Sequence, residues 1–266
     1  MNLEIYLKIA VNAALEAGAK IMEIYDSVVE VKYKEDKSPL TQADKEANTI
    51  INNYLIPTEI PIISEENKQI DFETRKQWRF CWIVDPLDGT KEFIKRNGEF
   101  TINIALVDNR KPVLGVIYVP VLKELYFGDT VDKTVFKAIL SKHQNSFESI
   151  MKKKTKIGPK QRTDLIQVVG SRSHMSEETL DYIKSIKKEG KTVEVVSKGS
   201  SLKFCLLAEG LADVYPRFAP TMEWDTAAGQ AICESVGLEV ISNETNLPLL
   251  YNKENLLNAW FIVKNQ

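Results

Sequence analysis

Histidine and cysteine are both scarce in this chain, which has two histidines and three cysteines among 266 residues. The two histidines are too few for a histidine-rich metal centre or an HExxH zinc helix. The cysteines, Cys81, Cys205 and Cys233, are odd in number, far apart and flanked by apolar residues, and no CxxC pair occurs. We therefore expect reduced, buried thiols in a cytoplasmic protein. If the chain is an enzyme, its chemistry must rely on carboxylates.

An excess of charge and a long apolar run are also missing. The 35 Lys+Arg against 37 Asp+Glu leave a formal charge of −2, which argues against a nucleic-acid partner. No apolar run approaches the roughly 20 residues that span a bilayer, and the first ten residues lack the order of a signal peptide. Peripheral association with the inner face of a membrane stays open. With 44% hydrophobic residues, the chain fits one large domain or two closely packed halves.

The first half of the chain changes from helical to strand patterns. Apolar residues at three- and four-residue spacings predict helices over 3–24 and 41–55, and Pro57 ends the second one. Strands are predicted at 61–63, 80–84, 101–107, 113–119 and 125–127. The last three of them read as a meander with turns at 108–109 and 128–129, so antiparallel pairing is expected here.

Residues 141–162 are polar, include three consecutive lysines (Lys152, Lys153 and Lys154) and contain Gly158-Pro159 near their end. We interpret them as a surface connection between residues 1–140 and 163–266, the two halves of one compact unit. For the lysines, a solvated face is favoured over an anion contact.

Strands and helices alternate regularly in the second half. The predicted strands are 165–169, 192–196, 212–215, 238–241 and 260–263, and the predicted helices are 176–188, 202–208 and 226–235. This alternation, added to the meander of the first half, indicates an α+β fold with layered α/β packing.

The segment DPLDGT carries the chemistry that the histidines cannot supply. An apolar strand ends at Asp85, and Asp88 follows three residues later. Two carboxylates on one tight turn, with the Leu87 carbonyl beside them, suit a hard cation such as Mg²⁺. Gly89 would let a phosphate approach the backbone, because free amides point outward at the start of the helix that follows. Asp-Pro-x-Asp-Gly is equally good turn chemistry, so the segment alone does not decide between the two interpretations.

Three further carboxylate positions would strengthen the metal interpretation. Glu65 follows another apolar run, and its carboxylate is therefore expected at a strand end. Asp44 follows Thr41 by three residues, which also fits a capping box, and Asp225 fits an N-cap before an apolar helix. Taken singly, each of these residues is more often structural than catalytic.

Together these segments resemble a known enzyme family. SEE, DPLDGTKEF and EWDTAAG, in this order, are similar to the metal-dependent, lithium-sensitive inositol monophosphatase superfamily. SPLTQAD, GSRSHMS, GSSLKFCLLAEGLADVYPR and PLLYNKENLL resemble its CysQ-type 3′(2′),5′-bisphosphate nucleotidases. The resemblance covers nearly the whole chain. It implies an αβαβα sandwich with an antiparallel N-terminal sheet and a mixed C-terminal sheet.

The resemblance also implies a site with two or three Mg²⁺ ions. Glu65, Asp85 and the Leu87 carbonyl would hold one ion, and Asp85, Asp88 and Asp225 a second. A third ion near Glu65 is also expected. Thr90 would orient the attacking water, with Asp44 hydrogen-bonded to Thr90 and accepting its proton. The phosphoryl group would meet the amides around Gly89 and Thr90.

Substrate recognition is implied for the second half. By resemblance, His174, Ser200, Lys203 and Arg217 would line the nucleotide side. Simpler roles stay open, since His174 could cap a helix and Lys203 could extend along a helix surface to reach solvent. Leu238 stands in place of a glycine usual in the family, and residues 129–133 replace a glycine-rich turn.

The implied activity is Mg²⁺-dependent removal of the 3′-phosphate from adenosine 3′,5′-bisphosphate (PAP), with PAPS as a second substrate. It belongs to sulfur metabolism. The alternatives are an inositol- or sugar-phosphate phosphatase and a non-catalytic phosphonucleotide-binding protein. The sequence leaves both monomer and homodimer open.

Overall fold

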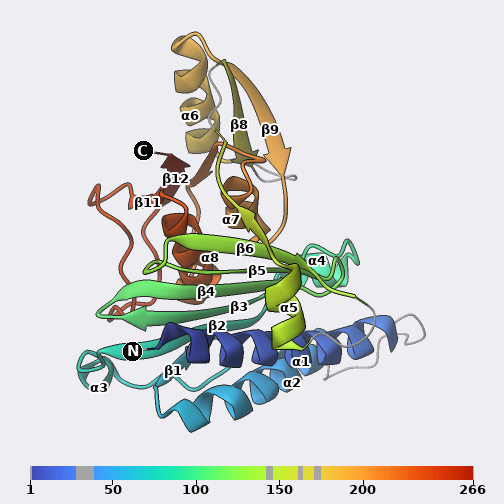
Figure 1. Ribbon diagram of the computed structural model, residues 1–266. Coiled ribbons are helices and arrows are strands. Elements are labelled where there is room, and N and C mark those ends of the chain that lie inside the picture. The colour runs from blue at the N-terminus through green and yellow to red at the C-terminus, as the bar shows by residue number, and fades with distance from the viewer. Residues whose placement is uncertain (1, 28–38, 142–145, 161–163, 171–174, 266) are drawn as a thin grey trace.

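The computed structural model describes residues 2–27, 39–141, 146–160, 164–170 and 175–265. Within them the chain forms five layers, in the order helices, sheet, helices, sheet, helix (Figure 1). This is the predicted αβαβα sandwich. The helices are α1 (Leu3–Ser27), α2 (Pro39–Leu55), α3 (Phe72–Arg75), α4 (Thr90–Ile94), α5 (Phe147–Lys153), α6 (Glu177–Lys188), α7 (Leu202–Ala208) and α8 (Glu223–Ser235).

The first sheet contains seven strands in sequential order. They are β1 (Ile62–Ser64), β2 (Phe80–Asp88), β3 (Thr101–Asp108), β4 (Lys111–Val119), β5 (Glu124–Asp129), β6 (Thr134–Ile139) and β7 (Thr155–Ile157). All neighbours pair antiparallel except β1 and β2, which are parallel. Helices α1 and α2 pack against each other and cover one face of this sheet. They do so through small and branched apolar residues such as Ala10, Ala14, Ala47 and Ile51, all fully buried.

The second sheet is mixed, as predicted, and has the order β11-β12-β10-β8-β9. Its strands are β8 (Leu165–Gly170), β9 (Thr192–Ser197), β10 (Val214–Arg217), β11 (Leu238–Ser242) and β12 (Phe261–Asn265). β8 runs parallel to β9 and β10, whereas β12 runs antiparallel to β10 and β11. Helices α7 and α8 lie between the two sheets, and α6 packs on the outer side of the second one (Figure 1).

Residues 141–162 contain structure that the sequence interpretation missed. The segment includes α5 and the seventh strand, β7, and it buries Phe147 and Ile150 in the core of the first half. The ammonium group of Lys154 lies 3.8 Å from the centroid of the Phe136 ring, a cation–π contact rather than a loose loop. The segment was read as polar because its many lysines outweigh, in the sequence pattern, the few apolar residues that it buries. The boundary between the halves stays a prediction.

One turn lies later than expected. Gly128 and Asp129 belong to β5, and the chain reverses over 130–133, where Asp129 Oδ1 accepts the N–H groups of Val131 and Asp132 at 3.0 and 2.7 Å. The turn leads into β6, which was not predicted. The predicted turn at 108–109 is present, with Asn109 at a φ of +47°.

The cysteine prediction is confirmed, because Cys81, Cys205 and Cys233 are buried free thiols. Leu238, in the position of a family glycine, starts β11 and is buried in a core to which both halves contribute. Among the described helices, none combines the length and the apolar character that crossing a membrane requires.

A glycine in β4 allows α8 to approach the first sheet closely. A Cβ atom on Gly115 would collide with the backbone carbonyl of Ala228 and lie 3.0 Å from the Ala231 Cβ. Because α8 carries a candidate site residue, this approach helps to fix the site as well as the core.

We expect Gly115→Ala to lower the free energy of unfolding by about 1–3 kcal/mol, the usual cost of overpacking a core. Urea denaturation of the purified protein measures this change. Gly158→Ala is the control, since a Cβ there has no neighbour within 4 Å, and its effect should stay within about 0.5 kcal/mol. Equal stabilities of the two variants would contradict the close approach.

Candidate active site

The DPLDGT segment forms the irregular end of β2. The pairing of β2 with β3 shifts register between Asp85 and Asp88, so both aspartates reach the same side of the sheet edge. Asp85 is almost fully buried, and its Oδ1 accepts the N–H of Leu87 at 3.0 Å. Gly89 follows as the N-cap of α4, as expected, with a φ of +101°. Any Cβ there would collide with the Ser200 hydroxyl, so both conformation and space require glycine.

Asp225 is not the N-cap that the sequence suggested. Helix α8 begins at Glu223, and Asp225 is its third residue. From this position its Oδ2 accepts the N–H of Met222 at 2.8 Å, which is the returning half of a capping box. The other carboxylate oxygen stays available, and the start of the helix favours a negative charge there. Similarly, Thr41 lies inside α2, which begins at Pro39, so it does not cap that helix.

The structure brings three of the predicted metal ligands together. One carboxylate oxygen each of Asp85, Asp88 and Asp225 lie within 4.8 Å of one another. Asp85 and Asp88 come from the first half of the chain and Asp225 from the second. Asp88 is also tied to the second half, because its Oδ2 accepts the N–H of Ser201 at 2.7 Å. The carboxylate cluster is therefore formed by residues of both halves, at the place where the halves meet.

Burial and mutual repulsion raise the pKa values of these carboxyl groups. Burial raises the pKa of Asp85 well above its ordinary value, and the charges of Asp88 and Glu65 raise it further. For the same two reasons, burial and the charge of Asp88, the pKa of Asp225 rises to about 7. Burial also raises the pKa of Asp88, although Lys203 and the Ser201 N–H oppose this. The cluster holds more negative charge than its surroundings compensate.

Glu65 and Asp44 lie around this cluster. Glu65 follows β1 at the exposed rim, and its pKa is raised by partial burial and by the charge of Asp88. Asp44 is buried on α2, and burial together with Glu66 and Glu65 raises its pKa to about 8. A hydrogen bond between Asp44 and Thr90 was expected. Asp44 Oδ1 does not make it, because this atom has no hydrogen-bond partner among the described residues. Thr90 itself is exposed at the start of α4.

A cavity of about 490 Å³ opens beside the aspartates and is lined by both halves. Lys203 and Arg217 line it together with Asp88 and Asp225. The ammonium group of Lys203 donates to the Ser200 carbonyl at 3.1 Å and lies over the Tyr215 ring. Arg217 donates to the Pro220 carbonyl at 3.3 Å, while its buried Nε has no partner in the described part of the chain. This nitrogen is a donor that a bound anion could satisfy.

The loop before α7 holds the two halves together at the site. Ser200 Oγ lies 2.8 Å from the Asp88 carbonyl and 2.7 Å from the Glu99 carbonyl, so its proton is directed at the protein backbone. Glu99 Oε2 accepts the Gly199 N–H at 2.9 Å, and Ser201 Oγ lies 2.6 Å from Asn103 Oδ1. The GSSLK motif marked this loop, but no local sequence signal identified Glu99 or Asn103 as its supports. His174 lies outside the described residues.

Comparisons with known proteins identify the family of this chain. The sequence profile described as the inositol monophosphatase family matches residues 2–261. The 3′(2′),5′-bisphosphate nucleotidase CysQ of Salmonella typhimurium is 42% identical over 254 residues, which cover 94% of this chain and 96% of that protein.

Solved structures give the same result. The crystal structure of CysQ from Bacteroides thetaiotaomicron, a bacterial member of the inositol monophosphatase family, superposes with a TM-score of 0.87 at 50% identity. The alignment covers 97% of this chain and 96% of that one. An inositol monophosphatase from Zymomonas mobilis, 23% identical with a TM-score of 0.74, shares the fold. The profile match and the nucleotidase relatives show that this chain belongs to the inositol monophosphatase family.

Proposed function

We propose that this protein is a 3′(2′),5′-bisphosphate nucleotidase that removes the 3′-phosphate of PAP to give AMP and phosphate. One observation carries the proposal. The carboxylates of Asp88 and Asp225 and the cations of Lys203 and Arg217 line the same cavity, which both halves of the chain form. A substrate with two separate phosphates suits such a site, since one phosphate needs a metal and the other needs cations. The names of the CysQ relatives support the same activity.

The donor set fits Mg²⁺. Three carboxylate oxygens within 4.8 Å of one another, with pKa values raised by burial and repulsion, favour a hard cation among them. Asp85, Asp88 and Asp225 would hold one ion, and Glu65, Asp85 and the Leu87 carbonyl a second, with a third near Glu65. Bound Mg²⁺ would supply charge neutralisation on the phosphoryl oxygens and would lower the pKa of the attacking water.

The amides and side chains of the protein then position the phosphoryl group and the attacking water, and accept the proton that the water loses. The amides of Gly89 and Thr90 face the phosphoryl group, and the exposed Thr90 hydroxyl orients the water. Asp44, with an unpaired Oδ1 and a pKa of about 8, accepts the proton. Water attacks phosphorus directly while the bond between phosphorus and the 3′ oxygen breaks, so no phosphoenzyme forms. The 3′ oxygen leaves as the AMP hydroxyl after taking a proton from solvent.

Lys203 and Arg217 bind the second phosphate, and Ser200 lines the nucleotide. PAPS is a second substrate, hydrolysed by the same chemistry. Lithium is expected to inhibit the phosphatase activity. Activity on inositol or sugar monophosphates would leave Arg217 Nε without an anion, and this observation favours a bisphosphate.

Asp88→Asn should lower kcat for PAP by about 10³-fold, because a neutral amide weakens a site that supplies several kcal/mol of transition-state stabilisation. Phosphate release with PAP and Mg²⁺ measures this rate, and EDTA should abolish it in the parent protein. A folded parent protein that releases no phosphate from PAP would refute the proposed function.

The metal-free protein should lose stability as the pH rises. Asp44, Asp85 and Asp225 have folded pKa values above the unfolded value of about 3.9, so between these values the folded state binds more protons. The stability that these groups contribute is therefore highest below about pH 3.9 and falls progressively as the pH rises towards about 8. In EDTA, we expect a melting temperature lower by about 5 °C or more at pH 8 than at pH 5.5.

Mg²⁺ should counter this loss, because it binds the ionised carboxylates and only in the folded state. Calorimetric melting with and without Mg²⁺ should show a larger gain at pH 8 than at pH 5.5. Asp85→Asn is the control and should remove most of the difference. Equal gains at both pH values in the parent protein would argue against a metal site at these carboxylates.

Arg217→Ala should raise KM for PAP by about 10–100-fold, the range expected for a lost hydrogen bond between charged groups. KM for 3′-AMP, which lacks the second phosphate, should change far less. Arg79→Ala, which removes an exposed arginine paired with Asp108, serves as the control and should change neither value. Equal losses on both substrates would favour an inositol- or sugar-phosphate phosphatase.

A further inference from the structure

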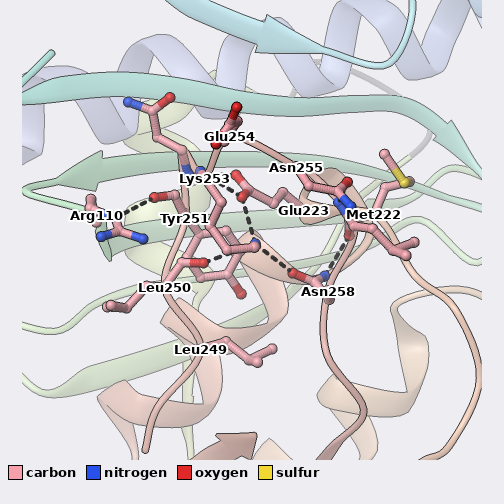
Figure 2. Close-up of polar contacts among 12 residues, drawn as sticks. Arg110, Met222, Glu223, Leu249, Leu250, Tyr251, Lys253, Glu254, Asn255 and Asn258 are labelled. Carbon is pink, nitrogen blue, oxygen red and sulfur yellow. Dashed lines mark hydrogen bonds and ion pairs between the residues drawn. The ribbon is translucent and has the colours of Figure 1, made fainter. Parts of the chain in front are cut away.

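A segment of irregular chain between β11 and β12, residues 249–258, runs along α8, and we call it the strap (Figure 2). It holds the middle of the helix through two contacts. Gln230 Nε2 donates to the Leu249 carbonyl at 3.0 Å, and the Tyr251 hydroxyl donates to Gln230 Oε1 at 2.8 Å. Helix α8 therefore has a partner along its length besides the two sheets.

The strongest contacts of the strap are at the first residue of α8. Glu223 is fully buried, and its carboxylate accepts the N–H groups of Asn252 and Lys253 at 2.6 and 3.0 Å. The Lys253 ammonium group forms an ion pair with the same carboxylate at 2.6 Å (Figure 2). The backbone N–H of Glu223 donates to the Leu256 carbonyl at 2.9 Å. Both the side chain and the backbone of this residue are thus fixed by the strap.

Asn258 completes this attachment. Lys253 Nζ donates to Asn258 Oδ1 at 3.2 Å, and Asn258 Nδ2 lies 2.8 Å from the Met222 carbonyl (Figure 2). Asn258 Nδ2 also lies 2.9 Å from Thr226 Oγ1. Met222 is also the residue whose N–H the Asp225 carboxylate accepts. The contacts of Lys253 therefore reach the residues on both sides of Asp225.

The other side of the strap is attached to the first half of the chain. The guanidinium group of Arg75, from α3, donates to Asn252 Oδ1 at 2.7 Å and to the Lys253 carbonyl at 3.1 Å. Arg110, in the turn between β3 and β4, exchanges backbone and side-chain hydrogen bonds with Tyr251. Since the first half also carries Asp85 and Asp88, the strap connects the two sides of the aspartate cluster.

We propose that Lys253, acting through Glu223 and Asn258, is a positioning residue that sets the place of Asp225 relative to Asp85 and Asp88. The inference rests on the metal site of the proposed function. The carboxylate of this ion pair is fully buried and its ammonium group is half-buried. Such a pair is weak evidence for stability, because desolvation offsets much of its attraction, so a role in geometry accounts better for this one. Residues that orient metal ligands from behind typically change metal affinity by about 10–100-fold when they are removed.

The test is a calorimetric titration of the full chain with Mn²⁺, which replaces Mg²⁺ and needs no turnover. Lys253→Met, which retains an apolar chain of similar length, should raise the Mn²⁺ dissociation constant about tenfold or more. Asn258→Ala is the milder second variant and should shift it in the same direction. At saturating metal, KM for PAP should stay within about twofold of the parent value, because the strap does not reach Lys203 or Arg217.

Lys137→Met is the matched control. It removes a partly buried lysine that pairs with two carboxylates, Glu124 and Glu209, at the far end of α7 from the site. It should lower the melting temperature but leave Mn²⁺ affinity within about twofold, since a general loss of stability does not move Asp225. The proposal is overturned if Lys253→Met, or Asn258→Ala should the former not fold, binds Mn²⁺ as the parent does. A parent protein inactive on PAP would bear on the proposed function alone.

Discussion

Repulsion among Asp85, Asp88 and Asp225 is the constraint on which the rest of this structure depends. Three carboxylates within 4.8 Å of one another are unfavourable without a counter-charge, and the described part of the chain gives them little. Backbone N–H groups of Leu87, Ser201 and Met222 each fix one carboxylate oxygen, and Asn103 also donates to the Asp88 oxygen at 3.4 Å. Among the described residues, no hydrogen-bond donor occupies the other oxygen of each aspartate. The protein thus fixes the orientation of each aspartate without neutralising the cluster. Such an arrangement is stable as part of a cation site.

The two halves of the molecule meet where this constraint applies. Ser201 reaches Asp88 from the second half, and Gly89 accommodates the Ser200 hydroxyl only because it has no Cβ. On the other side, Gly115 lets α8 approach the first sheet, and α8 delivers Asp225. The same junction forms the cavity with Lys203 and Arg217. The packing of the two halves therefore forms both the carboxylate cluster and the cavity that Lys203 and Arg217 line.

Much of the fold could be predicted from sequence, because periodicity reports which face of each element is buried. Helices α1 and α2, the central strands of the first sheet and the alternation of the second half follow it directly. The prediction of helix boundaries failed where the local sequence was compatible with two structures. EWDT fits an N-cap at Asp225 as well as a capping box from the third helical residue. In the structure, Asp225 accepts the N–H of Met222, and the strap holds Glu223 as the first residue of α8. Residues 147–157 were taken for a connection because their lysines outnumber the apolar residues that they bury.

The clustered aspartates were easier to predict than the residues that support them, and the reason is physical. A ligand must combine a particular donor with a particular backbone turn, so DPLDGT leaves a local signature around Asp85 and Asp88. A supporting residue needs only to fill a position with the right polarity, and partners distant in sequence can supply it. Glu99 accepts the N–H of Gly199, and Arg75 donates to Asn252, across 100 and 177 residues of sequence. Gly199 and Asn252 stand in the segments GSSLK and PLLYNKENLL, but neither segment indicates its distant partner. Such pairs arise from the packed fold itself, and a single sequence therefore predicts the chemistry of this site better than its geometry.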